Sequence, residues 1–176
     1  SWSGGADLSV SLGDIIGWNA WMELTGYWWP QVAAQYSNNP PAGPKGSHCS
    51  GFVATGSATV DGRPVIAHES FDDFWSGQYF NVCEEVVPAH GNRFKMQTVP
   101  GYIDSMTDFY VTSAGLGITE TTIAGFMGYD VNGIPEYVRS RKATQYANSI
   151  DEWVNLANQG NNGGYANIWL LADTKN

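Results

Sequence analysis

Cys49 stands where a segment rich in proline and glycine meets a run typical of a β-strand. Residues 37–47 hold three prolines and two glycines and no periodic apolar residue, which is typical of an exposed linker and of a place where a chain is cut. The strand-like run Phe-Val-Ala-Thr follows at 52–55. A cysteine that leads a strand out of a cleavable linker is a candidate nucleophile.

The chemistry depends on the bond between His48 and Cys49. If that bond is cut, the new α-amino group lies within reach of the thiol on the same residue. An α-amine titrates near pH 7.7–8.0, so it can act as a general base at mild pH without help from a histidine. The position therefore predicts a nucleophile and its base within one residue, Cys49.

The two cysteines, Cys49 and Cys83, could make one disulfide, and on their number alone a structural bridge is the ordinary interpretation. Because a nucleophile held in a disulfide could not attack, we expect two separate thiols. The cysteines and histidines available to a metal, including His90, show no ligand spacing, and no phosphate loop or dinucleotide fingerprint occurs. The sequence therefore predicts hydrolysis without a metal or cofactor.

Other chemically capable side chains have simpler interpretations. Asp104, Asp108 and Glu120 could form a carboxylate cluster, but acids near turns are usually caps and solvated surface, so we expect no catalysis from them. A group of tryptophans in the first 30 residues could bind a ligand, but aromatic stripes at helical spacing are usually core. These are Trp18, Trp21, Trp28 and Trp29.

The elements that must position Cys49 can be located from periodicity. Apolar residues at three- and four-residue spacings over 7–29 predict an amphipathic helix. Ser11 with Asp14 resembles a capping box and places its start near Leu12, and Pro30 is expected to help end it. After Cys49, the runs 52–55 and 64–67 flank an Asp-Gly turn, which predicts a hairpin that begins almost at the cysteine.

The rest of the chain alternates between strand and helix patterns, and an order of helix, strands, helices and strand suits a layered α+β domain. Residue Ser149 is expected to cap the second of two helices. The expected elements are strands at 95–99, 109–112 and 116–123, one or two helices within 135–157, and a strand at 165–172.

Composition limits the classes of function. The 176 residues, 43% of them hydrophobic, fit one packed domain. A net charge of −9, with only 8 lysines and arginines scattered along the chain, makes nucleic acid a poor partner. No stretch of 18 apolar residues occurs, so we expect no membrane-spanning segment.

Five motifs in order resemble the phospholipase-B-like family of N-terminal-nucleophile hydrolases, close to C45-type peptidases and acyltransferases. They are Gly-Ser-His-Cys-Ser at 46–50, Ala-His-Glu-Ser-Phe at 67–71, the Pro-Gly-Tyr to Phe-Tyr run at 100–110, the stretch from Ala-Gly-Leu to Thr-Glu-Thr-Thr at 114–122, and Gly-Tyr-Ala-Asn-Ile-Trp to Asp at 164–173. Each motif alone is weak, but their shared order over about residues 46–173 makes chance an unsatisfactory explanation.

The resemblance implies a four-layer αββα sandwich and self-cleavage between His48 and Cys49. Residues 1–48, the helical segment and linker, would be released from the catalytic segment 49–176 and held to it only by noncovalent packing. The freed Cys49 would attack an amide or ester and form an acyl-enzyme. His68 would orient or polarise its amine. Asn167 would donate to the oxyanion. Thr121 and Thr122 match the family's active-site threonine region, and which of the two points inward stays open.

The sequence departs from the family pattern at two places. Glu69 and Phe71 stand where the family usually has Asn or Ser and a Trp, which leaves the pocket wall in doubt. An arginine expected after the Asn167 strand has no counterpart, so we expect the domain to be incomplete at its C-terminus: either a second chain completes it or the sequence is a fragment.

Two function classes follow from these features. The first is a hydrolase of a small acylated amine, a peptide or a lipid ester, in a secreted, periplasmic or lysosome-like compartment. The second is a non-catalytic protein that keeps the fold for binding or assembly, and the two departures favour it. The oligomeric state is not indicated by the sequence.

Overall fold

The structure is a computed structural model that describes residues 9–36, 38, 49–123 and 125–175. The predicted linker and His48 therefore lie outside the described residues, apart from Asn38. The helices are α1 (Leu12–Asn19), α2 (Trp21–Glu23), η1 (Leu24–Trp28), α3 (Trp29–Tyr36), α4 (Phe74–Gly77), α5 (Glu136–Tyr146) and α6 (Ile150–Asn158). The strands are β1 (Ser50–Gly56), β2 (Gly62–Glu69), β3 (Val82–Val86), β4 (Phe94–Thr98), β5 (Phe109–Thr112), β6 (Leu116–Thr122) and β7 (Asn167–Asp173).

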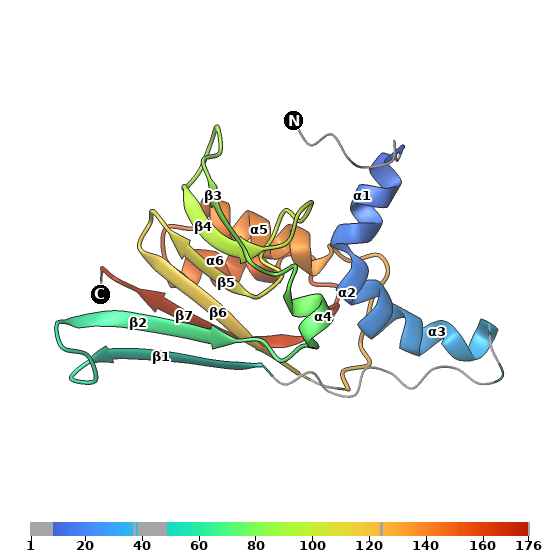
Figure 1. The fold of residues 1–176 in the computed structure, drawn as a ribbon, viewed down its shortest axis with the longest axis horizontal. Helices are drawn as coiled ribbons and strands as arrows, with labels where there is room; N and C mark the ends of the chain where they lie inside the picture. Colours follow the sequence, from blue (N-terminus) through green and yellow to red (C-terminus); the bar gives the residue numbers. More distant parts are fainter. Residues whose placement is uncertain (1–8, 37, 39–48, 124, 176) are drawn as a thin grey trace.

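The strands form two antiparallel sheets that lie face to face. Strands β3 to β7 make a five-stranded sheet in sequential order, and β1 and β2 make a separate hairpin. The hairpin packs against β6 and β7 on one face of the larger sheet, and α5 and α6 cover the other face (Figure 1). The main apolar core lies between this sheet and the two helices, around Phe94, Tyr110, Ile118 and Trp153.

These layers show the α+β class that the sequence predicts. The described residues supply three layers, in the order hairpin, five-stranded sheet and helices. A helical layer on the outer face of the hairpin is not present among them, so the four-layer αββα sandwich stays a prediction.

The N-terminal helical segment begins as predicted but ends later. Ser11 and Asp14 form the expected capping box, and α1 starts at Leu12. The helix does not end at Pro30, because this proline is the second residue of α3, where a missing backbone N–H costs little. A π-helical turn, η1, precedes α3, and the N–H of Trp29 donates to the carbonyl of Leu24. Proline therefore begins a new helix here instead of ending the old one.

The later elements agree closely with the predicted ranges. The strands at 109–112 and 116–122 and the helix capped by Ser149 are confirmed. Two elements were not predicted, α4 and β3. Strand β3 is an edge strand with four of its five residues exposed, so its sequence, Val-Cys-Glu-Glu-Val, lacks the apolar alternation on which the prediction depends. None of the described helices has the length and apolar character needed to cross a membrane.

Candidate active site

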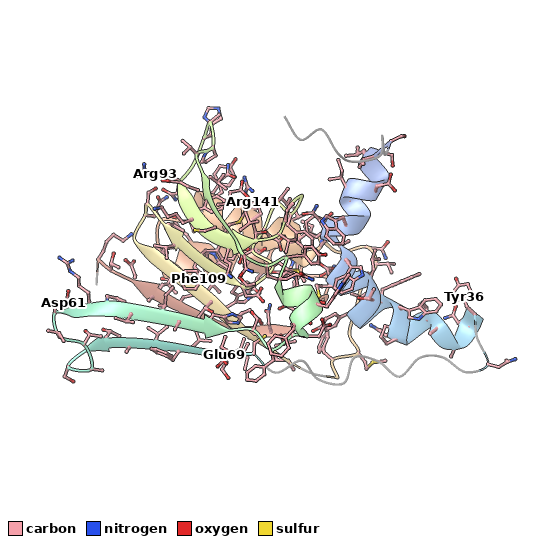
Figure 2. All side chains as sticks on the ribbon, in the orientation of Figure 1. Tyr36, Asp61, Glu69, Arg93, Phe109 and Arg141 are labelled. Atoms are coloured by element: carbon pink, nitrogen blue, oxygen red, sulfur yellow. The ribbon has the colours of Figure 1, made fainter. Side chains whose placement is uncertain are left out.

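The hairpin places Cys49 beside His68. Cys49 comes directly before β1, and the next residues pair Ser50 with Glu69 and Gly51 with His68 across the two strands. Gly51 lets the hairpin lie close to β6, since an added Cβ would be 3.4 Å from the Glu120 backbone oxygen. Figure 2 shows Asp61 at the far tip of the hairpin and Glu69 at the opposite end, which faces the helical segment. The cysteine therefore lies between the sheets and the N-terminal helices.

The His68 side chain is buried, with 3% of its surface exposed. Its Nδ1 lies 3.4 Å from the Ser70 hydroxyl, and its Nε2 lies 3.9 Å from Oε1 of Glu120, which is too far for a hydrogen bond. Burial lowers the pKa of His68, and this outweighs a smaller rise caused by the polar backbone of Glu120. His68 is therefore a neutral imidazole at neutral pH, and its Nε2 has no hydrogen-bond partner in the described part of the chain.

Glu120 belongs to a buried network with Asp108 and Tyr165. The Tyr165 hydroxyl lies 2.5 Å from Oδ2 of Asp108 and 3.1 Å from Oε1 of Glu120. Burial raises the pKa of both carboxyls, and the neighbouring Glu120 raises that of Asp108 further. Asp108 and Tyr165 are also the two described non-glycine residues with positive φ, at 54° and 47°. Backbone strain of this kind is often found at functional sites.

The Cys49 sulfur is half-buried and close to this network. Burial raises the pKa of the thiol, and the charges of Glu120 and Asp72 act in the same direction. Hydrogen bonds from the Phe71 backbone and the Thr122 hydroxyl act against the rise. The resting state is therefore a protonated thiol, and attack by the sulfur requires a base to remove its proton.

Of the two candidate threonines, Thr122 is the one that acts on the Cys49 thiol, because its hydroxyl lowers the pKa of that thiol. The Thr122 hydroxyl lies 3.5 Å from Oε1 of Glu120. Successive side chains of a strand point to opposite faces, so Thr121 shares the face of β6 on which Gly117 and Thr119 approach the hairpin residues Ile66 and Gly51. The role of either threonine at the site stays a prediction.

Asn167 lies next to the site, but its side chain lines a different cavity. It is the first residue of β7 and pairs with Thr122. Its amide nitrogen is buried without a hydrogen-bond partner among the described residues. The cavity that it lines is on the side of Trp153 and Trp169, against α6. Asn167 therefore lies directly opposite Thr122 on the neighbouring strand, and its amide nitrogen makes no hydrogen bond to the sulfur.

Cys49 opens into a cavity of about 360 Å³. This volume is at the lower end of the range for ligand sites, about 300–1,000 Å³. The polar groups that reach it include Asp72 and Asp108, and most of the wall is apolar or aromatic. The apolar wall residues are Trp21, Met22, Tyr27, Pro30, Phe71, Phe80, Met106, Ile123, Phe126 and Met127. The site is thus a thiol at the edge of an apolar hollow with a few polar groups.

The N-terminal segment supplies one wall of this cavity and is held by buried polar contacts. The Asn19 side chain donates to the Gly101 carbonyl and accepts from the Ile103 N–H, at 2.9 and 2.8 Å. Glu23 accepts from the Asn162 side chain at 2.5 Å and from the Glu136 backbone. Side-chain contacts of Asn19 and Glu23 therefore hold the N-terminal segment to the rest of the domain.

Two interpretations from the sequence are wrong. Asp104, Asp108 and Glu120 are not solvated caps, because their exposed fractions are 7%, 5% and 0%: the sheet, the hairpin and the N-terminal helices close over them. The tryptophan stripe is not core. Trp18 and Trp21 are 47% and 46% exposed, and Trp21 lines the cavity.

The positions of the remaining predicted residues are as follows. Cys49 and Cys83 are free, as expected, and Cys83 is exposed. Phe71 lines the cavity, so this departure from the family pattern changes the pocket wall, whereas Glu69 is exposed. His90 is exposed, and His48 lies outside the described residues.

The buried acids make stability depend on pH. Burial raises the pKa of Asp104 to about 7, from 3.8. The native state therefore keeps a proton that the unfolded chain loses above pH ~4. The stabilisation is complete below that pH and is lost as the pH rises to about 7, by up to about 1.4 kcal/mol per pH unit.

We expect the Asp104→Asn substitution to reduce this slope by about one proton, because an amide does not titrate. The measurement is the free energy of unfolding in urea at pH 5, 6 and 7. The exposed Asp61→Asn is the matched control and should leave the slope unchanged. An equal slope in wild type and Asp104→Asn would contradict the assignment.

Comparison with known proteins agrees with the motif order. A profile of the phospholipase B family matches residues 14–176. The chain is 30% identical over 149 residues to a Caenorhabditis elegans protein named as phospholipase B-like 3, covering 78% of this chain and 25% of that protein. Phospholipase B-like protein F of Dictyostelium discoideum is 28% identical over 137 residues, covering 72% and 24%.

Human phospholipase B-like 1 is 31% identical over 101 residues, covering 54% of this chain and 18% of that protein. The chain thus spans about a quarter or less of the length of these relatives. Because the profile covers nearly the whole chain, including every element around Cys49, the chain belongs to the phospholipase B family.

Proposed function

We propose that this chain carries the nucleophile of an amide or ester hydrolase, and that self-cleavage before Cys49 frees it. One observation supports this most strongly: the thiol of Cys49 lies at the edge of an apolar cavity, with His68 and Glu120 beside it. The family assignment supports hydrolysis in general, and the N-terminal cysteine mechanism is our proposal.

Self-cleavage consumes only water, and the thiol proton passes to the departing Cys49 nitrogen. The sulfur attacks the carbonyl carbon of His48, the C–N bond breaks, and the Cys49 nitrogen leaves as an amine with the thiol proton. Water then hydrolyses the thioester to a carboxylate on His48 and a thiol on Cys49. Thr122, whose hydroxyl lowers the pKa of the thiol, would orient the sulfur for the first step.

Turnover repeats this chemistry on a substrate. The raised pKa of the thiol means that a base must take its proton, and the freed α-amine is the nearest one. The sulfur attacks the substrate carbonyl, the amine returns the proton to the leaving group, and water hydrolyses the acyl-enzyme. His68, neutral and fixed beside Ser70, positions the amine. Asn167, whose unpaired amide lines the cavity beside Trp153, would have to turn toward Cys49 to donate to the oxyanion.

The cavity favours an acyl group as the part of the substrate that is recognised. Its apolar wall suits a short hydrocarbon chain, and Asp72 at the wall suits a polar or cationic leaving group. A small acylated amine, a peptide or a lipid ester meets this description. The relatives are named for phospholipase B, and a lipid ester is the substrate class that this name suggests.

The buried acids support an acidic compartment, such as a lysosome-like or secretory one. Asp104, Asp108, Glu120 and Glu136 all have raised pKa values. Each of them makes the fold more stable at acidic than at neutral pH.

Intact mass tests the processing step. After incubation at mildly acidic pH, we expect two fragments, 1–48 and 49–176, that elute together in gel filtration and separate in urea. Glu23→Ala should let the short fragment dissociate on dilution, because it leaves the Asn162 amide unsatisfied at a cost of about 1–3 kcal/mol. Glu84→Ala, on exposed β3, is the control.

Two outcomes would contradict parts of this proposal. Wild-type protein that stays uncut would exclude self-cleavage and favour the non-catalytic alternative, since an acylated nitrogen cannot act as a base. Fragments that separate without denaturant would show that the buried contacts of Asn19 and Glu23 do not hold the segment.

A further inference from the structure

Three metal-ligand types converge at the edge of the cavity. The Cys49 sulfur, a His68 ring nitrogen and a Glu120 carboxylate oxygen all lie within 4.8 Å of one another. Zinc binds sulfur, nitrogen and oxygen at 2.0–2.3 Å in a tetrahedron, which places its ligand atoms about 3.3–3.8 Å apart. The ligand atoms therefore need to close by at most about 1.5 Å, and one pair, His68 Nε2 and Glu120 Oε1, is already 3.9 Å apart.

Two of these side chains have unused, buried electron pairs. His68 is 3% exposed and Glu120 is fully buried, and His68 Nε2 and Glu120 Oε2 have no hydrogen-bond partner among the described residues. An unpaired buried polar atom costs about 1–3 kcal/mol. One cation would accept electron pairs from the His68 nitrogen, the Glu120 oxygen and the Cys49 sulfur at once. A single hydrogen-bond donor would satisfy fewer of these three atoms.

Neighbouring hydroxyl groups contact the second ring nitrogen of His68 and the second carboxylate oxygen of Glu120. His68 Nδ1 faces the Ser70 hydroxyl at 3.4 Å, which leaves Nε2 for a metal. The Tyr165 hydroxyl binds Oε1 of Glu120 at 3.1 Å, which leaves Oε2. Fixing the second ring nitrogen and the second carboxylate oxygen is how proteins orient metal ligands.

We propose that Cys49, His68 and Glu120 bind one Zn²⁺ ion, with its fourth position open to the cavity. On binding, the S–H bond of Cys49 breaks, a proton leaves to solvent and an S–Zn bond forms, so charge and atoms balance. The ion then holds the sulfur electron pair with which Cys49 would attack, and it blocks the thiol reversibly. The proposal goes beyond hydrolysis and does not depend on it.

The sequence shows no sign of such a site because the ligands come from three elements. Cys49 precedes β1, His68 lies in β2 and Glu120 lies in β6. Metal motifs are found in sequence by short spacing on one element, and here only the packing of the hairpin on the sheet brings the atoms together.

Cobalt is the probe that tests this, added to the reduced, metal-free full chain. A thiolate bound to Co²⁺ gives a near-ultraviolet charge-transfer band, and tetrahedral Co²⁺ gives intense visible bands. We expect both bands, saturation at one ion per chain and displacement by Zn²⁺. Cys49→Ser should lose the charge-transfer band, and Glu120→Gln should weaken binding at least about tenfold.

Matched variants outside the site give the control. Cys83→Ser and His90→Ala remove an exposed thiol and an exposed imidazole, and both should leave the bands and the affinity unchanged. A band that persists in Cys49→Ser or disappears in Cys83→Ser would overturn the proposal, as would the absence of a band at millimolar Co²⁺.

A second measurement needs no variant of the site. Zn²⁺ should slow the alkylation of Cys49 by iodoacetamide at least about tenfold and leave that of Cys83 unchanged, with recovery after a chelator is added. Equal slowing of both thiols, or of neither, would also overturn the site. Hydrolysis is measured separately, with a chelator present to keep the protein free of metal. A failure of zinc binding can then be told apart from a failure of hydrolysis.

Discussion

Cys49→Ala is expected to stop both self-cleavage and hydrolysis, the largest effect of any single change in this chain. Alanine has no atom that can attack the His48 carbonyl, so the α-amine is never freed and no acyl-enzyme can form. The substitution removes a half-buried sulfur, and folding should change little. Intact mass should show one uncut chain, and turnover of a fluorogenic N-acyl amide and of a phospholipid ester should fall to background.

Cys83→Ser is the matched control for this experiment, because it removes the exposed thiol. It should be cut and should turn over substrate as wild type does. If Cys49→Ala is cut at the wild-type rate, the nucleophile lies elsewhere. A third outcome is that wild type is cut, Cys49→Ala stays uncut, and wild type turns over neither substrate. In that case self-cleavage at Cys49 is supported and the proposed substrate class is wrong.

Asn167→Ala is expected to lower kcat about 100- to 1,000-fold, the scale for deleting one oxyanion donor. The loss should fall on kcat more than on KM, because the donor acts on charge that develops only in the transition state. The amide nitrogen has no hydrogen-bond partner among the described residues, so its removal breaks no observed contact. The melting temperature should therefore change little.

Asn167→Asp sharpens this test, because a carboxylate keeps the shape of the side chain and loses the donor. It should be as inactive as the alanine variant. Asn155→Ala, an exposed asparagine of α6, is the control and should retain full activity. Asn167 lines the cavity beside Trp153. An unchanged kcat in both Asn167 variants would show that Asn167 is only a wall residue of that cavity and does not stabilise the oxyanion.

Periodicity predicted most elements around the site. The capping box at Ser11, the hairpin after Cys49 and the helix capped by Ser149 all have local signals, and all are present. The exceptions are also local in origin. Pro30 fits a helix start as well as a helix end, and the edge strand β3 carries no apolar alternation because its residues are mostly exposed.

Some residues of the candidate site have a local signal in the sequence and others do not. Cys49 and His68 could be assigned to one hairpin from the sequence, but their register could not, because Gly56 lies opposite Gly62 and the loop is 57–61 instead of a two-residue Asp-Gly turn. Glu120 stands directly before the two predicted threonines, but its burial had no local signal, because acids are seldom buried and only the packing around β6 covers it. Asp108 and Tyr165 gave no such signal, because their positive φ values depend on the loops around them.

By itself the sequence determined the family, the order of the elements other than α4 and β3, and the thiol at the head of the hairpin. Only the tertiary structure decided that Glu120, Asp108 and Tyr165 are buried together and that the N-terminal helices form a cavity wall. The physical reason is that periodicity shows which side of an element is apolar but not which distant element covers it. Contact between the hairpin, β6 and the helical segment is what turns scattered acids into one buried, titrating site.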